Sequence, residues 1–115
     1  MNLISFIKQL QENPKSITFQ DTTQVIEENY EFEPTAFKNG NQFNNVGENN
    51  GSCKIVAFAK LQNLSKEATL ACFGAYYFEE VLNNPNGTDH QNIRNFVQTG
   101  WDGIQFEGEA LLPKK

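Results

Sequence analysis

The sequence has few of the residues from which catalytic and metal centres are usually built. Its 115 residues include one His, two Cys and one Trp, and no apolar run approaches the ~20 residues that a membrane span needs. Two Cys are too few for a disulfide-dense scaffold, and Cys53, Cys72 and His90 match no zinc-binding spacing. Nine basic against fourteen acidic residues give a net charge of −5, which opposes binding to a phosphate backbone. We therefore expect no metal, no cofactor, no nucleic acid and no membrane partner.

Asparagine and phenylalanine, by contrast, are abundant. Fifteen Asn and a mean hydropathy of −0.56 indicate long polar loops, while ten Phe supply the material of a core. The length fits a single domain, 1–115. Residues 1–10 lack the basic start and unbroken apolar stretch of a signal peptide, so we expect a soluble, acidic, cytoplasmic protein with reduced thiols. Specialised bacterial secretion uses N-terminal signals without a sharp pattern, so export by that route stays open.

Apolar residues at helical spacing predict about five helices. The first ends at Asn13-Pro14, because proline disfavours helical geometry in the residue before it. Thr18, followed three residues later by Asp21, predicts an N-cap for the second. The residues that define the first helix lie over 3–10, before its stop at Asn13-Pro14, and the later helices are expected over 18–30, 53–61, 65–82 and 88–100.

Local signals mark the ends of the later helices. Ser52 is placed to cap the third, and Gly74 inside the fourth predicts a close crossing by another element. Thr88-x-x-Gln91 has the form of a capping box, and Gly100 predicts a left-handed ending for the fifth.

Two short segments predict strands. Residues 30–38 alternate in polarity, and Pro34 either confines that strand to an edge or breaks it in two. Residues 104–106 are expected to pair with part of residues 33–38, whereas residues 39–51 read as an irregular loop. The fold class is therefore α+β, predominantly helical, with a small two-stranded antiparallel sheet.

Four glutamates gather where the second helix gives way to the first strand. They are Glu27, Glu28, Glu31 and Glu33. Such a cluster is either a docking patch for a basic partner or a solvated face, and charge runs of this kind usually face solvent. We favour the solvated face.

The long loop and the start of the last helix together predict a binding surface. The loop over 47–52 is glycine-rich and precedes a helix N-terminus, but it lacks the Walker A spacing, and Glu48 would repel a phosphate. Dense polar side chains, two helix N-termini and no complete catalytic set favour a non-enzymatic domain that binds a protein or a small molecule. The candidate binding residues are Glu48, Asn49, Asn50, Ser52, His90, Asn92 and Arg94.

The alternative is a small enzyme. Glu48 and His90 would share acid–base work, with Arg94 binding an anionic substrate, which requires Glu48 and His90 to face one pocket. A Cys–His pair is formally possible, but both cysteines lie in apolar helices, where a thiolate is disfavoured.

Three separated blocks of the sequence resemble the HopJ type III effector family. They read GENNGSCK over 47–54, LACFGAYY over 70–77 and GTDHQNIRNF over 87–96. With FQDTTQVIEENY over 19–30, PTAF over 34–37, TGW over 99–101 and FEGEAL over 106–111, the similarity covers residues 19–111. The resemblance implies a bacterial protein of unknown biochemical activity and no assigned catalytic residues. The family name, taken from proteins that plant pathogens deliver into host cells, adds type III secretion as a second possible location.

Overall fold

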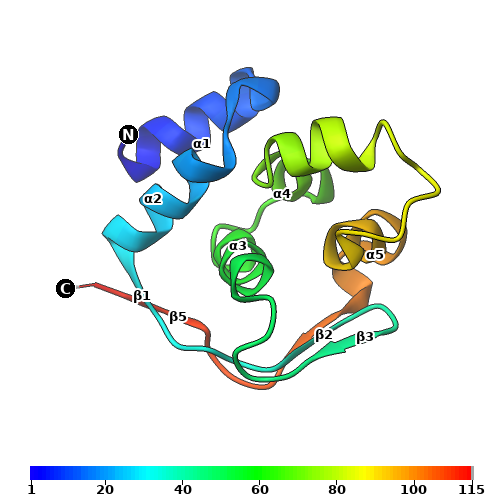
Figure 1. Ribbon diagram of the computed structural model, residues 1–115. Helices are drawn as coiled ribbons and strands as arrows, with labels where there is room; N and C mark the ends of the chain where they lie inside the picture. Colours follow the sequence, from blue (N-terminus) through cyan, green and yellow to red (C-terminus); the bar gives the residue numbers. More distant parts are fainter. Residues whose placement is uncertain (115) are drawn as a thin grey trace.

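Helices surround one central helix, and a β-ribbon runs along one side of the molecule (Figure 1). The computed structural model describes residues 1–114. In chain order the elements are α1 (Leu3–Glu12), η1 (Pro14–Ser16), α2 (Phe19–Asn29), β1 (Tyr30–Phe32), β2 (Phe37–Asn39), β3 (Gln42–Asn44), α3 (Asn50–Leu61), α4 (Lys66–Ala71), η2 (Tyr76–Val81), α5 (Gln91–Thr99), η3 (Gly100–Gly103), β4 (Ile104–Phe106) and β5 (Leu111–Pro113). The predicted helix-dominated α+β class is confirmed.

The central helix is α3, whose sequence is apolar around most of its circumference. Its buried residues are Cys53, Ile55, Val56, Ala57, Phe58 and Ala59. The Phe58 ring packs edge-on against Phe6 of α1 and Tyr30 of β1, with centroids 5.8 and 6.1 Å apart. Ser52 does not cap this helix, because α3 begins earlier and its N-cap is Asn49.

The start of α2 forms as its sequence predicts. The Thr18 hydroxyl accepts the N–H of Asp21 at 3.0 Å, and the Asp21 carboxylate accepts the N–H of Thr18 at 3.1 Å. Each half of this capping box satisfies a backbone donor that the first helical turn leaves free.

The prediction of one continuous helix over 65–82 is wrong. α4 ends at Ala71, Gly74 adopts φ +62°, and the chain resumes as the π-helix η2. A Cβ on Gly74 would lie only 2.7 Å from the backbone nitrogen of Phe19, so the predicted close crossing is confirmed. The start of α2 approaches too closely for any side chain at position 74, and the helix breaks there.

The strands form one long ribbon that is interrupted at Pro34. β4 pairs with β2 (Phe37 opposite Phe106), which confirms the expected pairing, and β5 pairs with β1 in the same register. Proline has no N–H to donate, so pairing lapses around it. The sheet count was wrong: β3 adds a third strand beside β2, inside the segment expected to be irregular, and β5 creates a second sheet.

The last helix begins later than its sequence predicts. α5 starts at Gln91 with His90 as its N-cap, so no capping box forms on Thr88. Gly100 has the predicted positive φ of 57°, but its ψ of −148° lies outside the left-handed helical region. Within residues 1–114, no helix combines the length and the apolar character needed to traverse a bilayer.

Candidate functional site

Three buried asparagines join the β2–β3 hairpin to the first turn of α5. Asn39 and Asn44 are fully buried, and Asn92 is 5% exposed. The side chains of Asn44 and Asn92 exchange two hydrogen bonds of 3.1 Å. Asn39 Nδ2 donates to the side chain and the carbonyl of Asn92 at 3.0 and 2.8 Å. A buried amide network of this kind fixes the hairpin against the helix start.

The start of α3 connects to the same network. Asn49 is exposed, and its Nδ2 donates to Asn44 Oδ1 at 2.7 Å. The N-cap of α3 and the first turn of α5 therefore both bind one side chain, that of Asn44. The structure thus brings the predicted residues Asn49 and Asn92 together.

α3 and α5 also begin in an unusual way. Their N-cap residues Asn49 and His90 have left-handed φ angles of 52° and 51°, and no side-chain hydrogen bond caps either helix. The N-termini of α1, α2 and α4 are capped by Asn2, Thr18 and Ser65. Because the first N–H groups of a helix carry partial positive charge, uncapped starts favour hydrogen-bond acceptors from outside the helix.

The other loop residues occupy the approach to α3 and its first turn. Glu48 is exposed, and its Oε1 accepts the N–H of Asn45 at 2.8 Å, which closes the turn locally. Asn50 is exposed and Ser52 half-buried in the first turn of α3. As ligand contacts, these residues stay predictions.

The carboxylate that His90 contacts is Glu80. His90 Nε2 lies 2.9 Å from Glu80 Oε1 and 3.9 Å from Asp89 Oδ2. The imidazole also packs against the ring of Tyr76, with centroids 5.3 Å apart. Neither Tyr76 nor Glu80 was expected beside His90, because both lie ten or more residues before it and no local pattern pairs them with it.

Arg94 holds the loop that precedes α5. The Arg94 side chain is only 9% exposed. Its Nε donates to the Asp89 carbonyl at 2.5 Å. Its two terminal nitrogens donate to the Asn84 carbonyl and to Asp89 Oδ1, each at 2.7 Å. The hydrogen bond from Arg94 is the main cause that lowers the pKa of the Asp89 carboxyl. Arg94 therefore shapes the loop, and its binding of an external anion stays a prediction.

Comparison with known proteins identifies the family. The sequence model of the HopJ type III effector protein family matches residues 3–111. The chain belongs to this family. It is similar to a crystal structure described as "unknown function protein VPA0580", with 58% sequence identity and a TM-score of 0.98 over 99% of this chain and 95% of that one. No curated protein matches the chain.

The two cysteines of this HopJ-family chain are poor nucleophiles. Both are free and fully buried. Burial raises the pKa of the Cys72 thiol to about 12 and also raises the pKa of Cys53. A thiol that resists deprotonation does not support a Cys–His catalytic pair.

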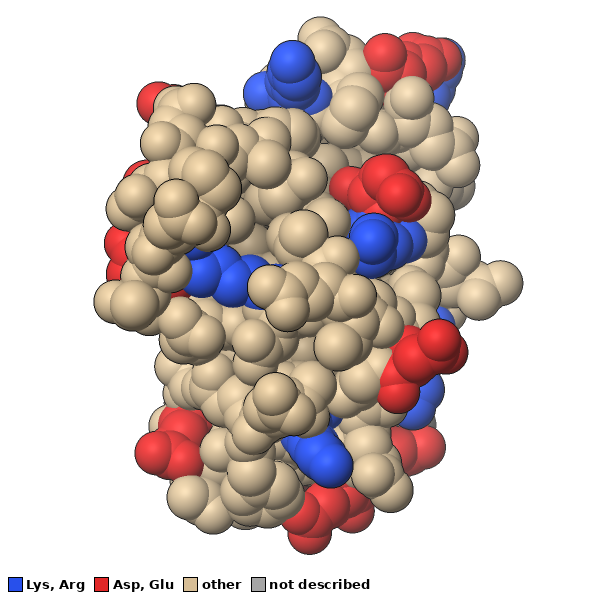
Figure 2. Space-filling view, turned by 90° about the vertical axis from the view of Figure 1, so that its right-hand side faces the viewer, with Lys and Arg blue, Asp and Glu red and all other residues tan. Residues whose placement is uncertain are grey.

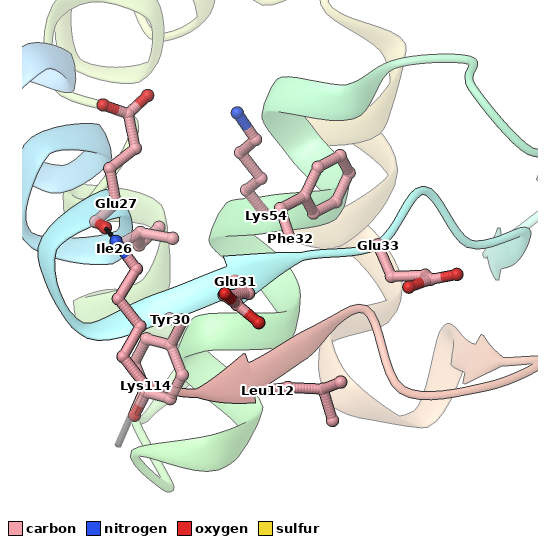
Figure 3. Close-up of a pocket in the computed structure, with 9 residues that line it drawn as sticks. All are labelled: Ile26, Glu27, Tyr30, Glu31, Phe32, Glu33, Lys54, Leu112 and Lys114. Carbon is pink, nitrogen blue, oxygen red and sulfur yellow. Dashed lines mark hydrogen bonds between the residues drawn. The ribbon is translucent and has the colours of Figure 1, made fainter.

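An open pocket of about 530 Å³ lies where β1, α2 and α3 meet (Figure 3). Three of the four clustered glutamates line it, and all four are exposed, as the solvated-face reading expects. Its lysines already have partners: Lys54 Nζ lies 4.9 Å from the Phe32 ring centroid, and Lys114 Nζ donates to the Glu27 carbonyl at 2.6 Å. The pocket shows no convergent donor set, and it includes none of the candidate binding residues.

Proposed function

We propose that this HopJ-family domain is a non-enzymatic binding domain, which recognises a protein or a small-molecule ligand through exposed residues at the starts of α3 and α5. The observation that carries the proposal is the junction at Asn44, where Asn49 and Asn92 bind one buried side chain. This junction holds two helix starts in a fixed relation, and neither start has a side-chain cap. Rigid support below exposed polar groups suits recognition by hydrogen bonds.

The chemistry of the neighbouring surface supports binding through hydrogen bonds. Figure 2 shows the side of the molecule that lies on the right in Figure 1, where charged groups are scattered around a broad uncharged area. The loop between η2 and α5 lies on this side and contributes exposed Asn83, Asn84 and Asn86. Uncharged amides offer donors and acceptors without long-range electrostatic steering.

The contacts of the candidate catalytic groups do not favour the alternative, a small enzyme. Glu48 closes its own turn, His90 contacts Glu80, and Arg94 holds its loop. Acid–base work by Glu48 and His90 on an anion bound to Arg94 would require all three to leave these contacts.

The binding proposal is tested by a fragment screen on the ¹⁵N-labelled protein. We expect binding fragments to shift the amide signals of Asn50, Ser52 and Gln91, because these residues lie in the first turns of the two uncapped helices. Asn50→Asp should weaken the hits, because it replaces a donor with a negative charge. Asn63→Asp makes the same change on an exposed residue just beyond the opposite end of α3, and as the matched control it should leave them intact. Hits confined to another face, or hits equally tight in Asn50→Asp, contradict the proposal.

The site of action is either the bacterial cytoplasm or, as the family's description supports, a host cell reached through type III secretion. A reporter fused behind the N-terminal segment tests the second location in a bacterium with a functional type III system. Entry of the reporter into host cells, lost when the secretion system is disabled, supports delivery. Retention of the fusion in the bacterium assigns the cytoplasm.

A further inference from the structure

Three metal-ligating side chains converge on the surface between η2 and α5. Glu80, Asp89 and His90 each offer one ligand atom, and these atoms all lie within 4.8 Å of one another. His90 Nε2 is 2.9 Å from Glu80 Oε1 and 3.9 Å from Asp89 Oδ2. Ligand atoms around a tetrahedral zinc ion are roughly 3.3 Å apart, because each metal–ligand bond is about 2.0–2.2 Å long. These two distances lie on either side of that value, and the third, between the Glu80 and Asp89 oxygens, is at most 4.8 Å, so rotation of the exposed carboxylates would bring the three atoms to zinc-binding separations.

We propose that Glu80, Asp89 and His90 bind a divalent transition-metal ion, of which Zn²⁺ is the representative. One imidazole nitrogen and two carboxylate oxygens make three protein ligands, and the remaining positions are open to water or to a ligand atom from a partner. The imidazole favours zinc, nickel, cobalt or copper over magnesium and calcium, which prefer oxygen ligands alone. The site does not depend on the function proposed above.

Residues outside the triad hold the ligands in place. Arg94 donates to Asp89 Oδ1 at 2.7 Å and leaves Oδ2, the oxygen nearer to His90, for the ion. The same guanidinium binds the carbonyls of Asn84 and Asp89, which fixes the loop that carries two of the ligands. The Tyr76 ring packs against the His90 imidazole. Supporting contacts of this kind commonly orient metal ligands and tune their affinity.

The site is open to ions from solution. The side chains of Glu80 and Asp89 are 49% and 56% exposed, and that of His90 is 26% exposed. Arg94 balances one of the two negative charges, so the site keeps a negative charge that attracts a cation.

The same distances would suit a protonated imidazole held between two carboxylates. Zn²⁺ and a proton compete for His90 Nε2, so stoichiometric Zn²⁺ uptake shows a metal site, and the absence of uptake leaves the ion pair alone. Isothermal titration calorimetry with ZnCl₂, and separately with MgCl₂, on the full chain in a non-chelating buffer measures this directly.

Three variants identify the ligands. His90→Asn removes the imidazole and retains a residue type that tolerates the left-handed backbone. Glu80→Gln removes a proposed ligand, and Glu79→Gln makes the same change on the adjacent residue of η2, outside the triad. Circular dichroism on each variant verifies that the fold is retained.

We expect one Zn²⁺ per chain, with affinity at least about tenfold lower in His90→Asn and Glu80→Gln and unchanged in Glu79→Gln. Mg²⁺ should bind far more weakly than Zn²⁺. On Zn²⁺ binding, the ¹⁵N signal of His90 Nε2 should move to the range of a metal-bound imidazole. The proposal is overturned by any of three results: no Zn²⁺ uptake, wild-type affinity in His90→Asn, or equal losses in Glu79→Gln and Glu80→Gln.

Discussion

α2 and α5 carry nearly the same start signal in sequence, and only one of them uses it. Thr18-x-x-Asp21 forms a complete capping box at the start of α2. Thr88-x-x-Gln91 does not, because the N-cap of α5 is His90, two residues after Thr88, and the Gln91 side chain donates to the Thr88 carbonyl at 2.6 Å.

The difference lies in what surrounds each start. At α2, Thr18 and Asp21 bind each other and complete the capping box. The segment that packs against this helix start does so at Gly74, which has no side chain to displace these two residues. At α5, Arg94 holds the Asp89 carbonyl and carboxylate, and His90 contacts Glu80 and Tyr76. These side-chain contacts together outweigh a capping box worth about 1 kcal/mol. Functional sites are expected where tertiary contacts override local sequence signals. The start of α5 is such a place, and both proposals include it.

The largest loss of stability should come from placing a side chain between residue 74 and the start of α2. Gly74→Ala places a Cβ 2.7 Å from Phe19 N on a backbone with φ +62°. Backbone strain and the clash together should lower the free energy of unfolding by about 3–4 kcal/mol, measured by urea denaturation. Gly47→Ala is the matched control, because Gly47 has φ +89° with no atom within 4 Å, and it should cost only about 1 kcal/mol. Equal losses in the two variants would mean that the contact with α2 is unimportant.

The next largest effect should come from removing the network that holds the start of α5. Asn92→Ala takes a partner from the side-chain amides of Asn39 and Asn44, both fully buried. The variant removes the three hydrogen bonds of the Asn92 side chain, while Asn39 keeps the Asn92 carbonyl and Asn44 keeps Asn49 and the Phe37 carbonyl. Losing three buried hydrogen bonds should destabilise the fold by about 2–3 kcal/mol in the same measurement. Asn86→Ala, on the exposed loop, should change stability by no more than about 0.5 kcal/mol. A neutral Asn92→Ala would show that the network does not fix the helix start.

The matched pair Thr18→Ala and Thr88→Ala tests the comparison of the two helix starts itself. Thr18→Ala removes a cap and should cost about 1 kcal/mol. Thr88→Ala removes no cap from α5 and should cost less than about 0.5 kcal/mol. If Thr88→Ala lowers the free energy of unfolding as much as Thr18→Ala does, a capping box at Thr88 and Gln91 forms in solution.

The sequence predicted those parts of the fold that local chemistry determines. The N-cap of α2 at Thr18, the buried α3 and the pairing of residues 104–106 with β2 depend on periodicity, caps or backbone pairing. β3, β5 and the break at Gly74 depend on which segments meet in space, and no window of a single sequence contains that information.

The candidate site was predictable to a similar extent. Asn49 and Asn92 were identified by their polar, helix-starting context, and the structure brings both to Asn44. Glu80 was missed because it lies ten residues from His90 inside a stretch that reads as an ordinary helix, whereas a π-helix and a left-handed His90 bring the two together. The polar segments were therefore predictable from the sequence, whereas the partners that tertiary contacts select were not.

The smallest effect on stability concerns the Arg94–Asp89 ion pair beside His90, and it is visible only when the pH is varied. The hydrogen bond from Arg94 holds the pKa of the Asp89 carboxyl below its usual range; desolvation, the next largest effect, opposes it, and the charge of His90 lowers the pKa to a smaller extent. A carboxyl whose pKa is lower in the folded state stabilises the fold above its unfolded pKa of about 3.9, and that contribution is lost as the pH falls through the folded value. Between about pH 6 and pH 3, the Tm of the wild type should therefore fall slightly more steeply than the Tm of Asp89→Asn. Thermal unfolding followed by circular dichroism across this range measures both slopes. Parallel curves would show that Arg94 does not stabilise the ionised Asp89, and with it the support assigned to one of the three proposed metal ligands would be lost.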